Sequence, residues 1–441
     1  MKIRSIFLPL ACAVALAAAG HARSGVAAPT PLDRLFEDAD RGNLAPAQAA
    51  LAGEQPPEVR ALIRARLAAA RLDPGAAEDP IVRRIAADAA ADPAQRRAAL
   101  AILTSAAFAS GDYAEAAIAG AQLEQALADA GLNRRAEEAN RTHSLARLLA
   151  GRPAQVVEGA VKPGTVPVHY DRVGLPRLEV KVNGQSQEAV FDTGANLTVL
   201  SRETAQRLGV EVIDSVARVG NGVEGSVPVR IGIVDKMDIA GTVMRNVAVL
   251  VIDDEQLTFP IPGGYDIRAI IGFPVLRALG RIRIENGGRF MVLPPRSGTE
   301  ATAAPNLRAS GNDLFVEAAV DGRPVPLHLD TGANLTSLSA RFAAANPDVV
   351  ARLETQELRT ASAGGTRHAQ AATWRQVPLA LAGQSLRLPE VTVTLPEGAT
   401  QPSNFGTLGS NVLRAFESYT IDFEAMRLDL GAPATVAAAA P

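Results

Sequence analysis

Cysteine is nearly absent from this sequence of 441 residues, and its single cysteine, Cys12, lies in an apolar run near the N-terminus. The rest of the chain can therefore form no disulfide, no thiolate nucleophile and no cysteine metal site. Lysine is scarce, no run of basic residues exceeds two, and the net charge is -3. This charge pattern does not indicate a surface for phosphates, so we expect no nucleic-acid partner.

Long apolar runs are also missing beyond the first residues of the chain. The run Ile6–Ala19 follows Lys2 and Arg4 and precedes small residues up to Ala28, which is typical of a cleaved secretory signal over residues 1–28. Its length of about 14 residues falls short of the roughly 20 that cross a bilayer, which disfavours a retained anchor. We expect an exported protein, periplasmic or secreted, without stable membrane insertion after cleavage.

Metal and dinucleotide motifs are lacking as well. The sequence has no His-Glu-x-x-His pattern and no carboxylate cluster spaced for a metal. Residues 220–225 spell Gly-x-Gly-x-x-Gly, but they lead into the predicted strand Val227–Ile233, whereas a dinucleotide site needs these glycines to open a helix. We therefore expect neither a metal nor an organic cofactor.

Residues 29–160 are rich in Ala, Leu, Arg and Glu. Apolar residues recur at three- and four-residue spacing, for example between Ala99 and Ala107, which predicts helices broken at segments containing Pro or Gly. Gly111–Ala116 resembles part of a tetratricopeptide repeat, but only once, whereas such arrays need about three repeats. We predict an irregular helical domain. Its role stays open between a structural cap or spacer and a docking surface or pro-region.

From about Val161 the sequence changes to alternating β-branched residues separated by Asn-Gly, Asp-Gly and Gly-Gly turns, which predicts strands. A segment rich in Pro, Ser, Thr and Ala, 294–305, divides this region into two similar halves, 161–300 and 301–432. A flexible tail is expected at 433–441. The predicted architecture is multidomain, with an α-helical N-terminal domain followed by an all-β bilobal domain.

One sequence motif occurs in both halves of the β region. From Asp192 to Ser201 and from Asp330 to Ser339, nine of ten residues are identical. In each half a hairpin turn precedes the aspartate by nine residues. A hydrophobic-hydrophobic-Gly motif, ending at Gly272 or Gly409, follows it by 80 or 79 residues. A whole lobe is thus duplicated within one chain.

This paired motif, hydrophobic-hydrophobic-Asp-Thr-Gly-Ala and then hydrophobic-hydrophobic-Gly before a short helix, resembles that of the pepsin and retropepsin clan of aspartic peptidases. The resemblance covers residues 161–430. Ala195 and Ala333 make it closer to retroviral and bacterial retropepsin-like domains than to pepsin, which has a hydroxyl residue there. Retroviral enzymes pair two identical chains, whereas this sequence holds both halves, so a monomer should suffice for activity on a peptide or protein substrate.

The resemblance implies that Asp192 and Asp330 form the catalytic dyad. Two carboxylates pressed together cannot both ionise cheaply, so the pair keeps one shared proton over a range of pH. Such a pair can act as base and acid at once. His328 lies two residues before Asp330 and so shares its strand face, and we interpret it as a strand residue without a catalytic role.

Four further residues are expected to support the dyad. The resemblance implies that Thr193 and Thr331 cross-link the two lobes beneath the carboxylates. Gly194 and Gly332 let the backbone approach the carboxylates without a Cβ in the way.

Glycine-tipped hairpins occupy the position at which members of this clan carry substrate flaps. Gly220 and Gly222 lie at the tip of the first, and Gly364 and Gly365 at the tip of the second. Neither hairpin has the flap tyrosine of pepsins. We predict flaps here, and ordinary surface hairpins are the alternative.

The sequence therefore predicts an exported aspartic endopeptidase that hydrolyses peptide bonds through a water held by two aspartates. The competing hypothesis is a catalytically inactive periplasmic protein that uses the same lobes to bind or scaffold an extended peptide. Intact Asp-Thr-Gly motifs in both copies favour the enzyme, because a binding module has no need of two carboxylates that repel each other.

Overall fold

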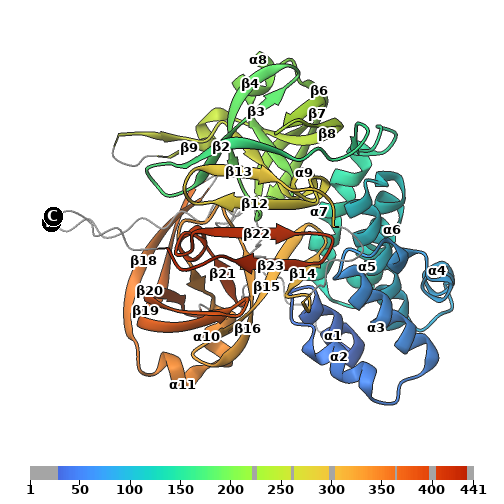
Figure 1. The fold of residues 1–441 in the computed structure, drawn as a ribbon. Coiled ribbons are helices and arrows are strands. Elements are labelled where there is room, and N and C mark those ends of the chain that lie inside the picture. The colour runs from blue at the N-terminus through green and yellow to red at the C-terminus, as the bar shows by residue number, and fades with distance from the viewer. Residues whose placement is uncertain are drawn as a thin grey trace.

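The structure is a computed structural model that describes residues 28–220, 226–259, 263–296, 303–362, 365–396 and 404–434. The expected signal peptide, apart from its last residue, and most of the expected tail lie outside the described residues. In Figure 1 the helices stand on one side, and two β-lobes lie one above the other beside them. The predicted fold class, helical domain plus bilobal β domain, is confirmed.

The N-terminal region contains α-helices and one 3-10 helix, as the apolar spacing predicts. They are α1 (Pro31–Ala39), α2 (Ala45–Ala52), α3 (Pro57–Ala69), η1 (Pro74–Ala77), α4 (Pro80–Ala87), α5 (Pro93–Ser110), α6 (Tyr113–Asp129) and α7 (Asn133–Leu149). Across the described ranges, none of the helices has both the length and the apolar character that a bilayer span requires.

The helix boundaries follow from local chemistry. The Asp92 side chain accepts hydrogen bonds from the backbone N–H groups of Ala94 and Gln95, and Pro93 opens α5 where no N–H is needed. Gly111 ends the same helix with φ +82°, a left-handed conformation that glycine adopts without steric cost. Asp112 then caps α6 through the N–H of Glu115.

Lobe 1 begins directly after the helices. Its elements are β1 (Val156–Val157), β2 (Gly164–Tyr170), β3 (Pro176–Val182), β4 (Gln185–Phe191), β5 (Thr198–Ser201), α8 (Arg202–Arg207), β6 (Glu211–Gly220), β7 (Ser226–Ile239), β8 (Thr242–Ile252), η2 (Asp254–Leu257), β9 (Thr258–Phe259), β10 (Tyr265–Asp266), β11 (Ala269–Ile271), α9 (Phe273–Ala278), β12 (Arg281–Glu285) and β13 (Arg289–Val292).

Lobe 2 follows the segment 294–305, which divides the β region into its two halves. Its elements are β14 (Leu307–Ser310), β15 (Asp313–Val320), β16 (Arg323–Leu329), β17 (Ser337–Leu338), α10 (Ala340–Ala345), α11 (Pro347–Val350), β18 (Glu354–Ser362), β19 (Gly365–Leu381), β20 (Gln384–Thr394), β21 (Gly406–Leu408), α12 (Ser410–Leu413), β22 (Ser418–Asp422) and β23 (Arg427–Leu430).

The two lobes share one strand order. Lobe 1 runs β3-β4-β11-β5-β8-β7-β6, and lobe 2 runs β15-β16-β21-β17-β20-β19-β18. Even the additional pairing of β3 with β7 has its counterpart in β15 with β19. The duplication predicted from the repeated motif therefore extends to the topology of the whole lobe.

A short antiparallel sheet joins the lobes. Strand β12 of the first half pairs with β22 of the second, from Arg281 opposite Asp422 to Glu285 opposite Ser418. Strands β13 and β23 flank this pair, and all four cross the centre of Figure 1 between the lobes. The lobes are thus held together by backbone hydrogen bonds on this face.

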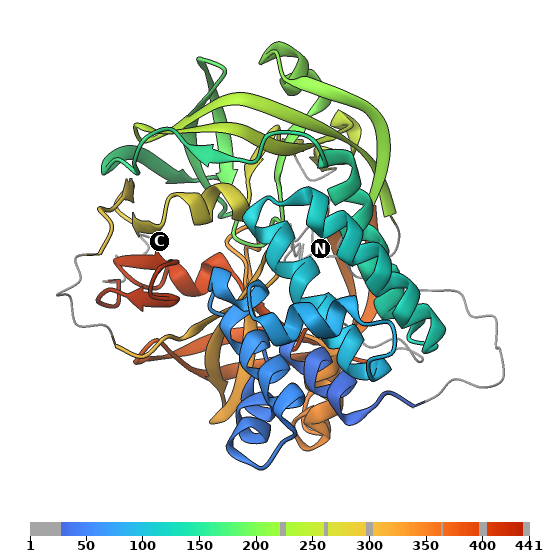
Figure 2. The ribbon, with the colours of Figure 1, turned by 90° about the vertical axis from the view of Figure 1, so that its right-hand side faces the viewer.

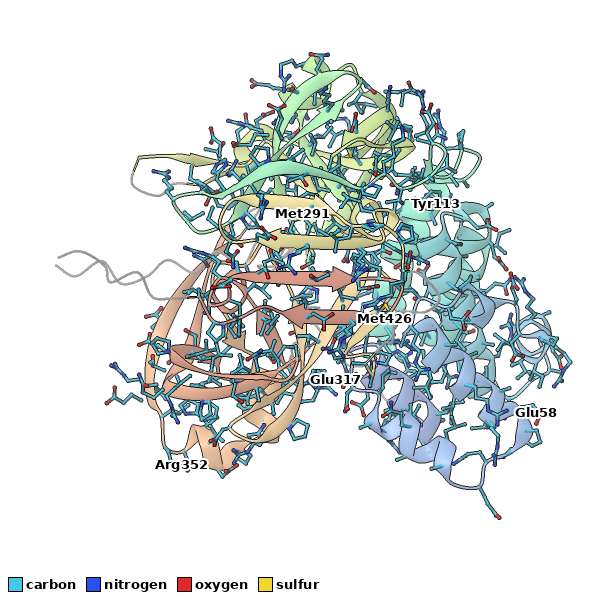
Figure 3. The ribbon with its side chains drawn as sticks, in the orientation of Figure 1. Glu58, Tyr113, Met291, Glu317, Arg352 and Met426 are labelled. Carbon is cyan, nitrogen blue, oxygen red and sulfur yellow. The ribbon has the colours of Figure 1, made fainter. Side chains whose placement is uncertain are left out.

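The helical domain packs onto both lobes. Tyr113 of α6 and Leu149 of α7 belong to the same hydrophobic cluster as Leu197 and Leu250 of lobe 1. Figure 3 shows Tyr113 where the helices meet the upper lobe, and Figure 2 shows the helices in front of the junction between the lobes. Toward lobe 2, the backbone N–H of Ala309 donates to the Ala70 carbonyl at 2.8 Å.

A buried ion pair fixes the first helix on the domain. Arg97 of α5 donates from Nε and Nη2 to the two carboxylate oxygens of Asp33 in α1, at 2.9 and 2.6 Å. Both side chains are less than a tenth exposed. Hydrogen bonds from Arg97 and Thr30 outweigh the effect of burial and lower the pKa of Asp33.

We expect Arg97→Ala to destabilise the protein by about 3–5 kcal/mol, because it leaves the Asp33 carboxylate buried without its partner. The matched control is Arg83→Ala, which removes the more exposed pair with Glu115 and should cost about 0–1 kcal/mol. Denaturant unfolding followed by circular dichroism measures both. Equal costs would contradict the structural role of the buried pair.

Candidate active site

Each predicted catalytic aspartate follows a strand that ends at the interface between the lobes. Asp192 comes directly after β4, and its backbone N–H donates to the Ile271 carbonyl of the parallel strand β11 at 3.1 Å. Asp330 comes directly after β16, and its N–H donates to the Leu408 carbonyl of β21, also at 3.1 Å. The hydrophobic-hydrophobic-Gly motif thus supplies the strand that orients each aspartate.

Two threonines connect the loops beneath the carboxylates. The N–H of Thr193 donates to Thr331 Oγ1 at 3.0 Å, and the N–H of Thr331 donates to Thr193 Oγ1 at 3.1 Å. Each hydroxyl then donates across the interface, from Thr193 to the Leu329 carbonyl at 2.7 Å and from Thr331 to the Phe191 carbonyl at 2.8 Å. The cross-link inferred for these residues is present as a reciprocal, fully buried network.

The two predicted glycines lie against the carboxylate of the opposite lobe. A Cβ on Gly194 would lie 2.6 Å from Cγ of Asp330, and one on Gly332 would lie 2.4 Å from Cγ of Asp192. Any larger residue would push the carboxylates out of place, because both contacts are shorter than carbon atoms tolerate. The glycines therefore allow the two aspartates to approach each other.

Backbone donors hold one oxygen of each carboxylate. The N–H of Gly194 donates to Asp192 Oδ1 at 2.8 Å, and the N–H of Ala333 donates to Asp330 Oδ1 at 2.9 Å. Within the described part of the chain, Oδ2 of each aspartate is buried and has no hydrogen-bond donor. These two oxygens thus keep their hydrogen-bonding capacity unused by the described residues.

The environment raises the pKa of both carboxyl groups. Burial raises the pKa of Asp192 well above its ordinary value, and the negative charge of Asp330 raises it further. Burial also raises the pKa of Asp330, although the nearby imidazole of His328 opposes this rise. The pair consequently retains a proton at a pH where isolated aspartates are ionised.

Two threonines that the sequence analysis did not single out complete the loops. Thr198 Oγ1 accepts a hydrogen bond from the N–H of Gly272, and Thr336 Oγ1 accepts one from Gly409. Both threonines occur six residues after their aspartate, within the repeated motif. Their presence in both copies of the motif was the signal that could have identified them. Threonine is common at the start of a strand, however, so its position there did not indicate a role in the site.

The predicted flap segments are hairpins. Gly220 ends β6 opposite Ser226 of β7, and Gly365 opens β19 opposite Ser362 of β18. Gly222 and Gly364, between these strands, lie outside the described residues. Whether the hairpins close over a substrate stays a prediction.

His328 lies in β16, as predicted, but it is almost completely buried, with 1% of its surface exposed. Its ring packs against Phe315 with 5.6 Å between centroids, and Nε2 lies 3.5 Å from Asp313 Oδ1. The carboxylates of Asp313 and Asp330 raise the pKa of His328 against the effect of burial. This side chain therefore belongs to the electrostatic surroundings of the dyad.

No group of three or more His, Cys, Asp or Glu side chains in the described ranges is arranged to hold a metal ion. The chemistry that the paired carboxyl groups can perform is the transfer of protons to and from a bound reactant.

The raised pKa of the dyad predicts a pH-dependent gain in stability for Asp192→Asn. A carboxyl group with a raised folded pKa stabilises the fold at low pH and loses this contribution as the pH rises through that pKa. Asparagine does not titrate, so the variant should melt higher than the wild type at about pH 8, with a smaller difference at about pH 4.

Asp235→Asn is the control, because Asp235 is exposed on β7. Its melting temperature relative to the wild type should change little between the two pH values. A variant at Asp192 that is less stable than the wild type at the higher pH would contradict the raised pKa.

Comparison with known proteins finds a similar family in each lobe. A sequence model described as aspartyl protease matches residues 178–275 and, separately, 316–412, together a little under half of the chain. No curated protein sequence gives a significant match. Among solved structures, the chain is similar to a retropepsin-like aspartic protease from Rickettsia conorii, at 21% identity over 32% of this chain and 96% of that one, with a TM-score of 0.24. Two segments of this single chain, one in each lobe, are thus similar to the aspartyl protease family.

Proposed function

We propose that this protein is an exported aspartic endopeptidase whose dyad is Asp192 and Asp330. The observation that carries the proposal is the reciprocal contact between lobes, in which the glycine of each Asp-Thr-Gly motif lies against the carboxylate of the other. This contact brings together two buried carboxyl groups with raised pKa values. Perturbed titratable pairs of this kind mark catalytic sites.

The proposed reaction is hydrolysis of a peptide bond by a water molecule between the two Oδ2 atoms. One carboxylate takes a proton from the water, whose oxygen forms a bond to the peptide carbonyl carbon, while the protonated partner gives its proton to the carbonyl oxygen. As the C–N bond breaks, the carboxyl group that took the water proton gives it to the leaving amine, and the other carboxylate takes a proton from a hydroxyl of the tetrahedral intermediate, which becomes the new carboxylic acid. Because the proton is shared, acid and base roles belong to the pair.

The chain supplies both halves of the dyad, so we propose that a monomer is active. Export rests on the N-terminal sequence pattern, Lys2 and Arg4 before the apolar run Ile6–Ala19. The competing role, an inactive periplasmic peptide-binding or scaffold protein, is disfavoured by the energetic cost of burying two carboxylates together. Incubation with a random peptide library separates the two roles, since an enzyme yields products and a binder retains intact peptides.

Asp192→Asn and Asp330→Asn should each lower kcat by about a thousandfold or more, because each removes one half of the shared-proton pair. The double variant should be little worse than either single variant, since residues that act as one unit have non-additive effects. Steady-state cleavage of a fluorogenic peptide measures the loss, and Asp235→Asn is the exposed control. Near-normal turnover in a folded single variant would exclude the dyad as the catalytic group.

Inhibition should follow the same chemistry. Statine-type compounds carry a hydroxyl that replaces the attacking water, so they should inhibit cleavage at far lower concentrations than peptides of the same sequence bind. Chelators and thiol reagents should leave the rate unchanged, since the proposed reaction uses only carboxyl groups and water. Loss of activity in a chelator that added metal restores would overturn the mechanism.

A further inference from the structure

A cavity of about 310 Å³ lies between the helical domain and the two lobes. Helices α1, α5, α6 and α7 form one wall, and Figure 2 shows these helices over the junction of the lobes. The opposite wall includes Asn196 of lobe 1 and Asn312 and His328 of lobe 2. We call this space the interdomain cavity.

Two residues of the cavity wall come from the chain segments that carry the dyad. Asn196 follows Asp192 by four residues in the same loop, and His328 precedes Asp330 by two residues in β16. The side chain of Asn312 donates to the Asn196 carbonyl at 2.9 Å and so links the two lobes at the cavity wall.

The carboxylates of the helical wall are already paired. Glu37 accepts hydrogen bonds from Arg41 and Arg134, both at 2.6 Å, and Glu138 accepts one from Arg134 at 2.8 Å. Asp40 lies 3.1 Å from Arg66. Arg135, which also lines the cavity, lies 3.6 Å from Asp40 and 3.7 Å from Asp33. Arg141 is the further cation of this wall.

Arg141 is half-buried in α7, and its Nε and Nη2 atoms have no hydrogen-bond partner among the described residues. Burial lowers the pKa of its guanidinium group, against the attraction of Glu138 and Glu137. On the lobe side, the nearly buried His328 is paired with Asp313, which also lines the cavity, at 3.5 Å between Nε2 and Oδ1, so Arg141 supplies the free donors. Desolvated donors without acceptors are costly, and a ligand with acceptor oxygens would satisfy them.

We propose that the interdomain cavity is a terminal subsite that binds a carboxylate of a peptide, with Arg141 as its principal donor. The planar fork of a guanidinium group matches a carboxylate through two parallel hydrogen bonds. The ionised side chains around Arg141 disfavour a doubly charged group such as a phosphate. The carboxylate comes either from the C-terminus of the peptide or from an acidic side chain.

This inference rests on the proposed function, which supplies the peptide as the ligand. Its test measures binding and does not need cleavage. Asp192→Asn in the full chain serves as the parent, so that peptides stay intact. Three random libraries of short peptides are offered in equilibrium dialysis and quantified by mass spectrometry. One has free C-terminal carboxylates, one has C-terminal amides, and one has C-terminal amides with a glutamate introduced at each position in turn.

The parent should retain the free-acid or the glutamate library about tenfold more strongly than the plain amide library, as expected for a hydrogen-bonded ion pair. The library that is preferred identifies the source of the carboxylate. Arg141→Gln should abolish the preference, and Arg141→Lys should reduce it because lysine lacks the fork. Arg147→Gln is the control, since Arg147 is an exposed residue of the same helix and does not line the cavity.

Equal retention of all three libraries by the parent would overturn the proposal. The proposal would also be overturned if both folded variants at Arg141 kept the preference for carboxylate-containing peptides, because the carboxylate would then bind elsewhere. If the wild type cleaves no peptide while the parent shows the Arg141-dependent preference, the peptidase assignment fails and the subsite stands.

Discussion

The reciprocal hydrogen bonds of Thr193 and Thr331 are the constraint on which the site depends. They tie the two loops at a fixed distance, so that Asp192 and Asp330 face each other although their like charges oppose this arrangement. Four buried hydrogen bonds with backbone partners in both lobes can offset such a cost. Separation of the lobes would break all four together, which makes the dyad and the lobe interface one cooperative unit.

A second attachment reinforces the first on another face of the molecule. Strands β12 and β22 pair across the lobes, and the helical domain shares a hydrophobic cluster with lobe 1 while contacting lobe 2. This packing disfavours the pro-region among the roles left open for the helical domain. A pro-region that is later removed would expose apolar surface around Leu197 and Leu250 at the edge of the site.

Much of the fold could be predicted from local patterns. The Asp-Pro and Gly-Asp breaks became helix caps at Asp92 and Gly111, and the hairpin turns at 183–184 and 321–322 hold Asn183 and Asp321 with φ near +49°. The burial of His328 was not predicted. Alternation along a strand predicts on which face of the sheet a side chain lies, but it does not predict what packs against that face. The pairing of β12 with β22 also escaped prediction, because no local signal specifies which distant strand is the neighbour.

The sequence by itself determined that two copies of one lobe exist, that each carries Asp-Thr-Gly, and that helices precede them, because these properties follow from residue identity and short-range periodicity. Tertiary structure alone decided that Gly332 would lie against Asp192 of the other lobe, and that Arg141 and His328 would line the same cavity. Contacts between residues more than a hundred positions apart depend on how whole elements pack, and packing is a property of the assembled core.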